Sequence, residues 1–415
     1  MDIDVSELIY DWNTLEQTPA SRPVELVDET LRDGLQSPSL IQPRIQEKVY
    51  LLYLMNDLGI QYVNTGLPAA SEVVRHDCRV LAREISNHGL RIRPQCAGRT
   101  VLQDVETIIE VAQWAGTEVE ACLFIGSSPI RQYVEDWDLD TMLRLTEEAI
   151  RHAVDAGLPV TYITEDTTRA RPETLRRLYT RAIECGASRL CLCDTVGHAT
   201  PEGTRQLVTF VRGIVAETGV DVALDWHGHR DRGLSVANAL AAIEAGVDRV
   251  HATALGIGER SGNVPMEILL ANLKLLGYLD WDLRLLPEYC HVVTEACGAP
   301  LPFNYPVAGA DAFRTAVGVH AAAIAKGMAK GDQWLGERVY CSVPASLIGR
   351  AHTIEIGPLS GMHNVRFWLS SRGIEVPDLV AEKILAAAKQ AQRLLMDEEI
   401  ERILVTMQRR MEHTA

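Results

Sequence analysis

The sequence lacks any uninterrupted run of about 18 apolar residues, the length that a membrane-spanning helix needs. We also expect no secretory signal, because the first residues, MDIDVSELIYDWNTLEQ, carry acidic side chains where a signal peptide has a basic segment followed by an apolar one. We therefore expect no membrane partner and a cytoplasmic location.

The chain contains no run rich in lysine and arginine. Its 40 Lys and Arg residues against 56 Asp and Glu residues give a formal net charge of −16. Binding to a nucleic-acid backbone needs clustered cations, so we expect no nucleic-acid partner. The nine cysteines form no CxxC pair and no regular spacing. An odd, scattered set of this kind is typical of reduced thiols in a cytosolic protein.

What the sequence does contain is an ordinary globular composition, with 47% hydrophobic and 23% charged residues, and a repeating pattern from residue 23 onward. Short apolar runs alternate with segments of helical spacing, several of which end in glycine. The runs lack the clean alternation of a half-exposed strand, as is typical of strands buried on both faces. They occupy residues 24–30, 60–67, 90–98, 119–126, 159–166, 189–197, 222–229 and 249–258.

Eight such units predict an α/β fold, a (β/α)8 TIM barrel over residues 23–283. A doubly wound parallel sheet is the alternative, although no GxGxxG turn follows the first run. Beyond the barrel, a Pro-rich segment (298–309), a small-residue helix (317–327) and a terminal amphipathic stretch (377–412) predict small α-helical subdomains. We divide the rest of the chain into an N-terminal extension (1–22), a linker and subdomain (284–372) and a C-terminal helical region (373–415).

Polar side chains follow the predicted strands at their C-terminal ends, where TIM-barrel enzymes carry their chemistry. His227 and His229 lie two residues apart in a strand, so both imidazoles can approach one ion. Asp33 follows the first strand and Asn263 follows the eighth, and both strands neighbour the seventh in a closed barrel. Such a set leaves positions open for substrate and suits Mg, Mn, Co or Zn. A histidine pair alone also occurs by chance on exposed turns.

Three further polar side chains stand at strand ends. Arg32 suits a carboxylate or a developing oxyanion, or alternatively an ion pair with Asp28 or Glu165. Glu165 could serve as a base or beside the metal, or form a salt bridge across the barrel mouth. Thr195 suits a hydrogen bond to a bound carboxylate, with helix capping as the alternative. We expect His251 to be a packing or surface residue.

Four motifs in this order resemble the 2-isopropylmalate synthase and homocitrate synthase family, within the DRE-TIM metallolyase superfamily. They are DETLRDGLQSP (28–38), DTVGHATP (194–201), HGHRDRGLSVANALAAIEAG (227–246) and GIGERSGN (256–263). The resemblance covers nearly the whole chain, because it continues through LPFNYPVAGADAF (301–313), VGVHAAAIAKG (317–327) and IGRAHTIEIGPLSGMHNV (348–365).

The resemblance implies a barrel followed by helical subdomains, in a homodimer in which the C-terminal region of one chain reaches over the active site of its partner. It implies the same four metal ligands, Asp33, His227, His229 and Asn263. Arg32 is then similar to the arginine that stabilises the enolate or carbonyl oxygen, with Gln36 beside it. In the C-terminal region, His320 resembles the partner-chain histidine that helps deprotonate acetyl-CoA, and Tyr340 resembles the nearby tyrosine.

The implied activity is that of an acyltransferase of amino-acid biosynthesis, which condenses acetyl-CoA with a 2-oxo acid and hydrolyses the thioester. A metal that holds the keto and carboxylate oxygens polarises the carbonyl carbon. The methyl group of acetyl-CoA is a poor carbon acid, so a tuned base must remove its proton while cations stabilise the enolate.

The chain departs from the family pattern at three points. Asn64 stands where the family has glutamate, and an amide can hold a hydrogen bond but cannot act as a base. Arg230 replaces the usual asparagine after the histidine pair and places a cation near the metal, unless it pairs with Asp231. The long regulatory domain of leucine-inhibited isopropylmalate synthases is not expected.

The identity of the oxo acid depends on the segment GSSPIRQYVED, which contains Arg131. Homocitrate synthases have a similar arginine for the distal carboxylate of 2-oxoglutarate, so the sequence favours an acidic 2-oxo acid, with 2-oxoisovalerate next. Arg131 could instead pair with Glu135 or Asp136. We expect Gln36, Asn64, Arg131 and Thr195 to bind this substrate.

Two other functions stay open. Hydroxymethylglutaryl-CoA lyases share RDGLQ but carry a reactive cysteine in the loop after strand eight, where this chain has GIGERSGN. A non-catalytic homologue that senses an oxo acid or CoA is the second alternative, because of Asn64.

Overall fold

The computed structural model describes residues 8–14, 23–331 and 333–413, which fall into two compact units. The barrel unit lies within Glu16–Pro300, and the C-terminal unit lies within Leu301–Ala415 and includes residues 8–14. Most of the expected N-terminal extension, residues 1–7 and 15–22, lies outside the described residues. Its described part holds a short 3-10 helix, η2 (Trp12–Thr14).

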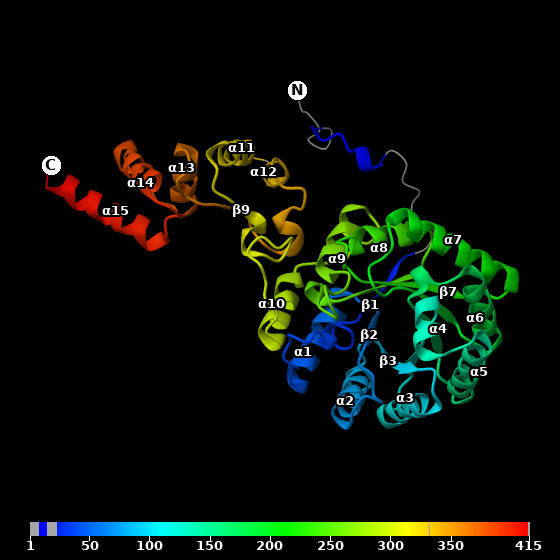
Figure 1. The fold of residues 1–415 in the computed structure, drawn as a ribbon. Coiled ribbons are helices and arrows are strands. Elements are labelled where there is room, and N and C mark those ends of the chain that lie inside the picture. The colour runs from blue at the N-terminus through cyan, green and yellow to red at the C-terminus, as the bar shows by residue number, and fades with distance from the viewer. Residues whose placement is uncertain (1–7, 15–22, 332, 414–415) are drawn as a thin grey trace. The chain divides into compact units, whose positions relative to one another are not determined.

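Eight parallel strands form a closed barrel in chain order, which confirms the predicted TIM barrel (Figure 1). Seven lie inside their predicted runs, and β3 extends one residue further. The ring closes through β1, which pairs with both β2 and β8, in the register Val27 to Tyr62 and Val27 to His251. The strands are β1 (Glu25–Asp28), β2 (Tyr62–Asn64), β3 (Arg93–Arg99), β4 (Glu120–Gly126), β5 (Val160–Glu165), β6 (Arg189–Asp194), β7 (Ala223–Gly228) and β8 (Arg249–Ala252).

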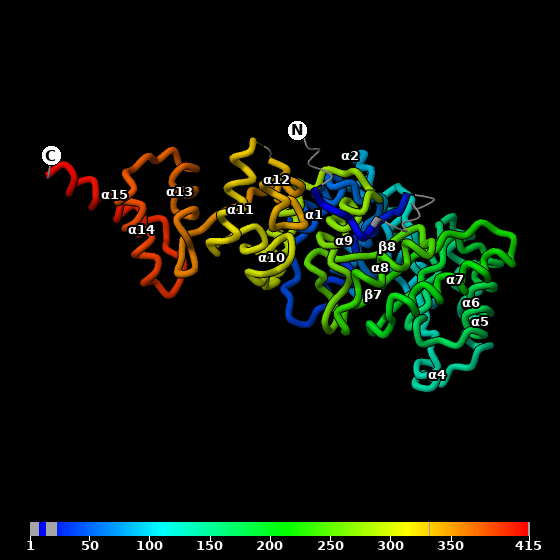
Figure 2. The backbone as a smooth tube through the Cα atoms, turned by 90° about the horizontal axis from the view of Figure 1, so that it is seen from above, coloured from blue at the N-terminus to red at the C-terminus, as the bar shows by residue number. Residues whose placement is uncertain are grey.

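Helices surround the strands (Figures 1 and 2). Their ends follow local chemistry: the Ser71 hydroxyl accepts a hydrogen bond from the Val74 N–H at the start of α2, and Thr200 does the same for Gly203 at the start of α7. Among the described helices, none has the length and apolarity needed to cross a membrane. The helices are α1 (Ile45–Leu58), α2 (Glu72–His88), α3 (Leu102–Ala115), α4 (Pro129–Glu135), α5 (Leu139–Asp155), α6 (Pro172–Glu184), α7 (Pro201–Thr218), α8 (Ser235–Glu244), α9 (Met266–Leu275) and α10 (Leu286–Cys297), with 3-10 helices η3 (Gly34–Gln36), η4 (Thr167–Arg169) and η5 (Ala254–Gly256).

The two faces of the barrel strands differ in composition. Leu26, Val63 and Val250 are fully buried among apolar neighbours, as expected for the layer between strands and helices. On the alternate face, Arg249 and Asp225 are also fully buried and form an ion pair inside the barrel. Barrel interiors are usually filled by branched apolar side chains, so a charged interior is a distinctive feature of this chain.

The C-terminal unit is mainly helical, as predicted. Its largest apolar cluster joins α13, α14 and α15 through residues such as Trp368, Ile384 and Ile400. The expected terminal stretch (377–412) is two helices, because the backbone leaves the helical conformation at Ala391, and the Glu399 carboxylate accepts the Met396 N–H at the start of the second helix. The elements are η6 (Ala310–Phe313), β9 (Arg314–Thr315), α11 (Gly318–Ala329), α12 (Gln333–Arg338), η7 (Ala345–Ile348), β10 (Thr353–Ile354), α13 (Met362–Ser371), α14 (Asp378–Gln390) and α15 (Asp397–Glu412).

Candidate active site

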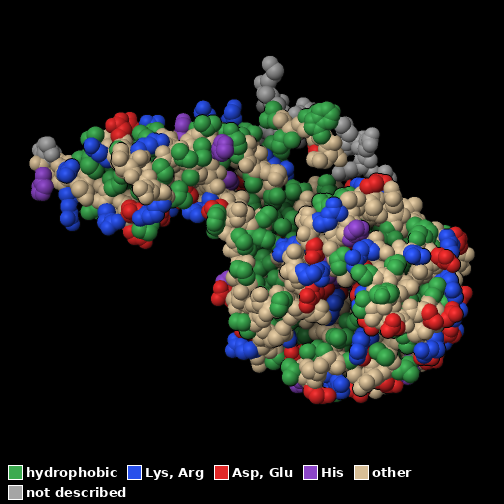
Figure 3. Space-filling view, in the orientation of Figure 1, with side chains coloured by type: hydrophobic (Ala, Val, Ile, Leu, Met, Phe, Trp, Pro, Cys, Tyr) green, Lys and Arg blue, Asp and Glu red, His purple; other side chains and the backbone are tan. Residues whose placement is uncertain are grey.

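A cavity of about 290 Å³ opens at the C-terminal ends of the barrel strands. In the end-on space-filling view, charged side chains lie around a hollow at the centre of the barrel (Figure 3). Eight of the predicted site residues line the cavity: Arg32, Asp33, Gln36, Asn64, Glu165, Thr195, His227 and His229. The structure therefore brings together side chains from five strands and their loops.

Asp33, His227 and His229 form a compact buried cluster in this cavity. The Asp33 Oδ2 atom lies 3.0 Å from His227 Nε2 and 3.5 Å from His229 Nε2, and the two Nε2 atoms are 3.4 Å apart. Burial lowers the pKa of His227, and although burial raises the pKa of Asp33, the Arg32 guanidinium and the two imidazoles bring it well below its usual value. Neutral imidazoles and an ionised carboxylate are the forms that bind a metal.

Asn263 completes this cluster from the glycine-rich loop after β8. An isolated bridge pairs its backbone with His229. Its Nδ2 atom donates to the Ile257 carbonyl at 3.1 Å, whereas its buried Oδ1 atom has no hydrogen-bond partner among the described residues. Gly258, at φ +145°, allows this approach, because a Cβ there would collide with Asn263 Nδ2. An orphaned buried oxygen on a residue whose backbone pairs with that of His229 fits a fourth ligand to a divalent cation.

Arg32 contacts a carboxylate that the sequence did not indicate. Its Nε and Nη2 atoms both lie 2.7 Å from Glu29 Oε2, so the expected partners Asp28 and Glu165 are wrong. Burial raises the pKa of Glu29, but Arg32 and His251 lower it to about 2. The third guanidinium nitrogen, Nη1, lies 3.6 Å from Asp33 Oδ2. Arg32 thus lines the cavity, and Glu29 binds the Arg32 guanidinium from the side away from the cavity.

Asn64 and His251 also contact Glu29. The Asn64 amide donates to Glu29 Oε1 at 3.3 Å, and His251 Nδ1 lies 3.1 Å from the same oxygen. His251 is buried, as expected of a packing residue, yet it lines the cavity. Strand alternation could have identified it, because His251 shares the inner face of β8 with Arg249.

Glu165 and Arg131 form an ion pair at the cavity rim. Arg131 Nε lies 3.0 Å from Glu165 Oε1, and its Nη2 lies 3.0 Å from Glu135 Oε1. Of the two alternative partners named for Arg131, Glu135 is therefore present, and Glu165 forms a salt bridge at the cavity rim. Burial raises the pKa of Glu165, and Arg131 opposes that change. Glu165 lines the cavity, whereas Arg131 is not among its lining residues.

Two of the alternatives considered for the loops are wrong. Thr195 does not cap a helix: its hydroxyl accepts the Asp166 N–H at 2.8 Å. Arg230 does not pair with Asp231, because Asp231 pairs with Arg260 at 2.9 Å and the Arg230 guanidinium donates to the Ser261 carbonyl at 2.5 Å. Arg260 and its neighbour Glu259 line the cavity and were missed by the sequence analysis.

The other two predicted site residues, His320 and Tyr340, belong to the C-terminal unit. Their rings stack with centroids 4.1 Å apart and planes tilted by 31°. Both side chains are exposed. The structure therefore brings this pair together within its own unit.

The comparisons with known proteins place these features in context. Residues 23–289 match the model of the HMGL-like family. The chain is 32% identical over 370 residues to the homocitrate synthase of Methanopyrus kandleri, covering 88% of this chain and 87% of that protein. It is 31% identical over 373 residues to the 2-isopropylmalate synthase of Sulfolobus acidocaldarius, covering 89% and 91%. The solved HMG-CoA lyase of Bacillus subtilis is similar in fold, with a TM-score of 0.58 at 21% identity over 69% of this chain and 97% of that one.

Proposed function

Because the chain belongs to the HMGL-like family, we propose that it is an acyltransferase of the 2-alkylmalate synthase type, which condenses acetyl-CoA with a 2-oxo acid. Relatives named as homocitrate, 2-isopropylmalate and (R)-citramalate synthases support this reaction class. The observation that carries the proposal is the convergence of Asp33, His227 and His229 beside Arg32 in one cavity. Asn263 adds to it, because its backbone pairs with that of His229.

In this reaction, a base removes a proton from the methyl carbon of acetyl-CoA, and that carbon bonds to the keto carbon of the oxo acid. The keto oxygen gains a proton to become a hydroxyl. Water then attacks the thioester carbonyl, the carbon–sulfur bond breaks, and CoA leaves as a free thiol. The products are a 2-alkylmalate and CoA.

Asp33, His227, His229 and Asn263 would hold a divalent cation (Mg, Mn, Co or Zn), whose chemistry is to polarise the carbonyl of a bound oxo acid. Arg32 directs its Nη1 group away from Glu29, where it can stabilise an oxygen that gains negative charge. The Thr195 hydroxyl already accepts one hydrogen bond, so its own proton can be donated to a substrate carboxylate, with Gln36 and Asn64 beside it.

Proton transfer is assigned to groups from both units. Glu165 lines the cavity with a raised pKa caused mainly by burial, which suits a side chain that holds and releases a proton. His320, stacked on Tyr340, would serve as the base toward acetyl-CoA from the partner subunit of a homodimer. Its exposure in the isolated chain is consistent with a role toward a second copy.

The cavity favours an oxo acid with an uncharged side chain, such as 2-oxoisovalerate. Its remaining walls include Leu67, Ala97, Phe124 and Ile163. Two carboxylates already neutralise Arg131. An acidic oxo acid of the 2-oxoglutarate kind, which the sequence favours, is the second candidate, because Arg131 stands at the rim and would bind a distal carboxylate if Glu165 moved aside.

The test is a thiol-release assay with acetyl-CoA, Mg²⁺ or Mn²⁺, and a panel of oxo acids: 2-oxoisovalerate, 2-oxoglutarate, pyruvate, oxaloacetate, an aromatic oxo acid and phosphonopyruvate. Release above background with one of them, strongest with 2-oxoisovalerate, is the expected result. No release with any oxo acid would overturn the proposal. Cleavage of hydroxymethylglutaryl-CoA in a parallel assay would favour the lyase alternative, and calorimetric binding without turnover would favour a sensor.

A further inference from the structure

A row of buried charged residues runs through the barrel beneath the cavity. His251 Nε2 lies 3.1 Å from Asp225 Oδ2, and Arg249 contacts the same oxygen at 2.6 Å. Arg249 also lies 2.5 Å from Glu120 Oε1. Each charge in this row therefore has an opposite charge in contact, as a buried ion pair requires. Glu29 is the upper end of the row, through its contact with His251.

Glu29 lies behind the cavity wall. It is 1% exposed and is not among the residues that line the cavity, yet it contacts three residues that are. Oxygen Oε2 holds Arg32 through two nitrogens, and oxygen Oε1 contacts both Asn64 and His251. One carboxylate thus fixes three lining side chains together, and Arg32 keeps only Nη1 for a ligand.

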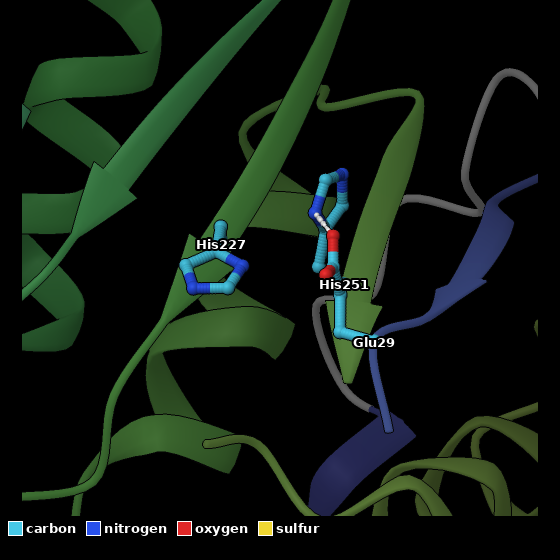
Figure 4. Close-up of side chains that lie close together, drawn as sticks. All are labelled: Glu29, His227 and His251. Atoms are coloured by element: carbon cyan, nitrogen blue, oxygen red, sulfur yellow. Dashed lines mark ion pairs between the residues drawn. The ribbon is translucent and has the colours of Figure 1, made fainter. Parts of the chain in front are cut away.

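The group Glu29, His227 and His251 has the spacing of a second metal site. The contacts argue against this use. Both Glu29 oxygens are occupied, and both nitrogens of His251 face carboxylates. Figure 4 shows the Glu29 and His251 side chains joined by their ion pair, with His227 to one side. Only His227 has a nitrogen to offer, and it already contacts Asp33.

We propose that Glu29 is a positioning residue, which fixes the guanidinium of Arg32 so that Nη1 faces the reacting oxygen. This inference rests on the proposed condensing function. Glu29 acts through Arg32. Its carboxylate is itself held by His251, the neighbouring member of the row of buried charged residues. The same contacts exclude Glu29 as a metal ligand.

A double-mutant cycle tests this role. Glu29→Gln keeps the shape of the side chain but removes its charge, and we expect kcat to fall roughly 10- to 100-fold, as for the loss of other orienting partners, with a smaller change in KM. In an Arg32→Lys background, where one ammonium cannot make the two-nitrogen contact, the same substitution should lower kcat less than about threefold. Equal falls in both backgrounds would overturn the proposal.

Three further measurements separate positioning from folding and ligation. Glu29→Asp keeps the charge but shortens the side chain by one methylene, so its carboxylate no longer reaches Arg32. We expect its kcat to fall nearly as much as that of Glu29→Gln. Full activity of Glu29→Asp would contradict the positioning role, because the charge alone would then be sufficient. Glu25→Gln, on the same face of β1 and paired with Arg189, is the matched control and should keep its activity. Calorimetry with Mn²⁺ alone should give one ion per chain and equal affinity for wild type and Glu29→Gln. Weaker binding or a second ion would contradict the inference.

These outcomes are distinct from failure of the proposed function. If the wild type releases no thiol with any oxo acid, the condensing function fails, whereas the Mn²⁺ titration still reports whether Glu29 is a ligand. If the wild type is active and the cycle is additive, the function stands and the positioning role fails.

Discussion

Asp28 and Glu29 are consecutive residues at the end of β1, both almost completely buried, and their pKa values move in opposite directions. Asp28 faces the helices, where burial raises its pKa to about 6 despite hydrogen bonds from Thr30 and the Tyr289 hydroxyl. Glu29 faces the barrel interior, where Arg32 and His251 outweigh burial and lower its pKa to about 2. Burial alone therefore favours the protonated acid, and at Glu29 the adjacent cations reverse that preference.

The same contrast extends over the two faces of the whole barrel. The layer between strands and helices is mainly apolar, and Asp28 there accepts hydrogen bonds from the Thr30 N–H and the Tyr289 hydroxyl. The interior is a network in which carboxylates alternate with arginine or histidine from Glu29 to Glu120. The interior can therefore keep charges in fixed positions beneath the site for which we propose an anionic substrate and a divalent cation.

The largest expected effect comes from comparing the same type of substitution, Asp to Asn, on the interior face and on the helix-facing side of the barrel. Asp33→Asn removes a metal-facing charge from the interior, and we expect metal-dependent thiol release to fall by about 1000-fold or more, because a metal supplies several kcal/mol to such a transition state. Asp28→Asn, which faces the helices, should leave kcat within about threefold. Steady-state kinetics at saturating Mn²⁺ measures both. Comparable losses would show that the two faces are not functionally separate.

The second test removes a cation from the interior network. Arg249→Met leaves Asp225 and Glu120 buried without their shared partner, so we expect the free energy of unfolding to drop by about 3–5 kcal/mol. The control is Arg176→Met, whose pair with Glu217 is exposed, and it should cost less than about 1 kcal/mol. Urea denaturation followed by circular dichroism gives both values. A small loss for Arg249→Met would mean that water replaces the missing cation.

The third test uses the raised pKa of Asp28. Because the folded state holds the proton up to about pH 6 and the unfolded state only to its ordinary value of 3.8, Asp28 contributes stability below pH 4 that is lost as pH rises to 6. The difference corresponds to about 3 kcal/mol at most. Between pH 4 and 7, the unfolding free energy of the wild type should therefore decline relative to that of Asp28→Asn. Parallel curves would show that Asp28 titrates normally.

The strand count and the four metal-ligand candidates could be predicted because both depend on spacing. Residues 227 and 229 share a face by strand alternation, and closure of the barrel brings Asp33 beside them. The partner of Arg32 was missed because Asp28 and Glu29 lie four and three residues before it in the sequence, and only the orientation of β1 distinguishes them.

The contacts of the loops and of the C-terminal unit lay beyond sequence reasoning. Asp231 could pair with Arg230 or Arg260, and the choice depends on loop conformations that have no period. The stacking of His320 on Tyr340 joins a residue of α11 to one that follows α12, 20 positions later, and only the resemblance to a family singled them out.

The smallest expected effect concerns the rim, where Arg131 differs from the interior cations because its ion pairs are partly exposed. If the oxo acid has an apolar side chain, Arg131→Gln should change KM for 2-oxoisovalerate less than about threefold, since exposed pairs are worth little. KM for 2-oxoglutarate, if that acid is used, should rise about tenfold, because a bidentate contact to its distal carboxylate is lost. Arg144→Gln, which breaks an exposed pair on α5, is the control. Equal changes for the two acids would remove Arg131 from substrate recognition, and a large rise for 2-oxoisovalerate would show that the rim pair shapes the cavity itself.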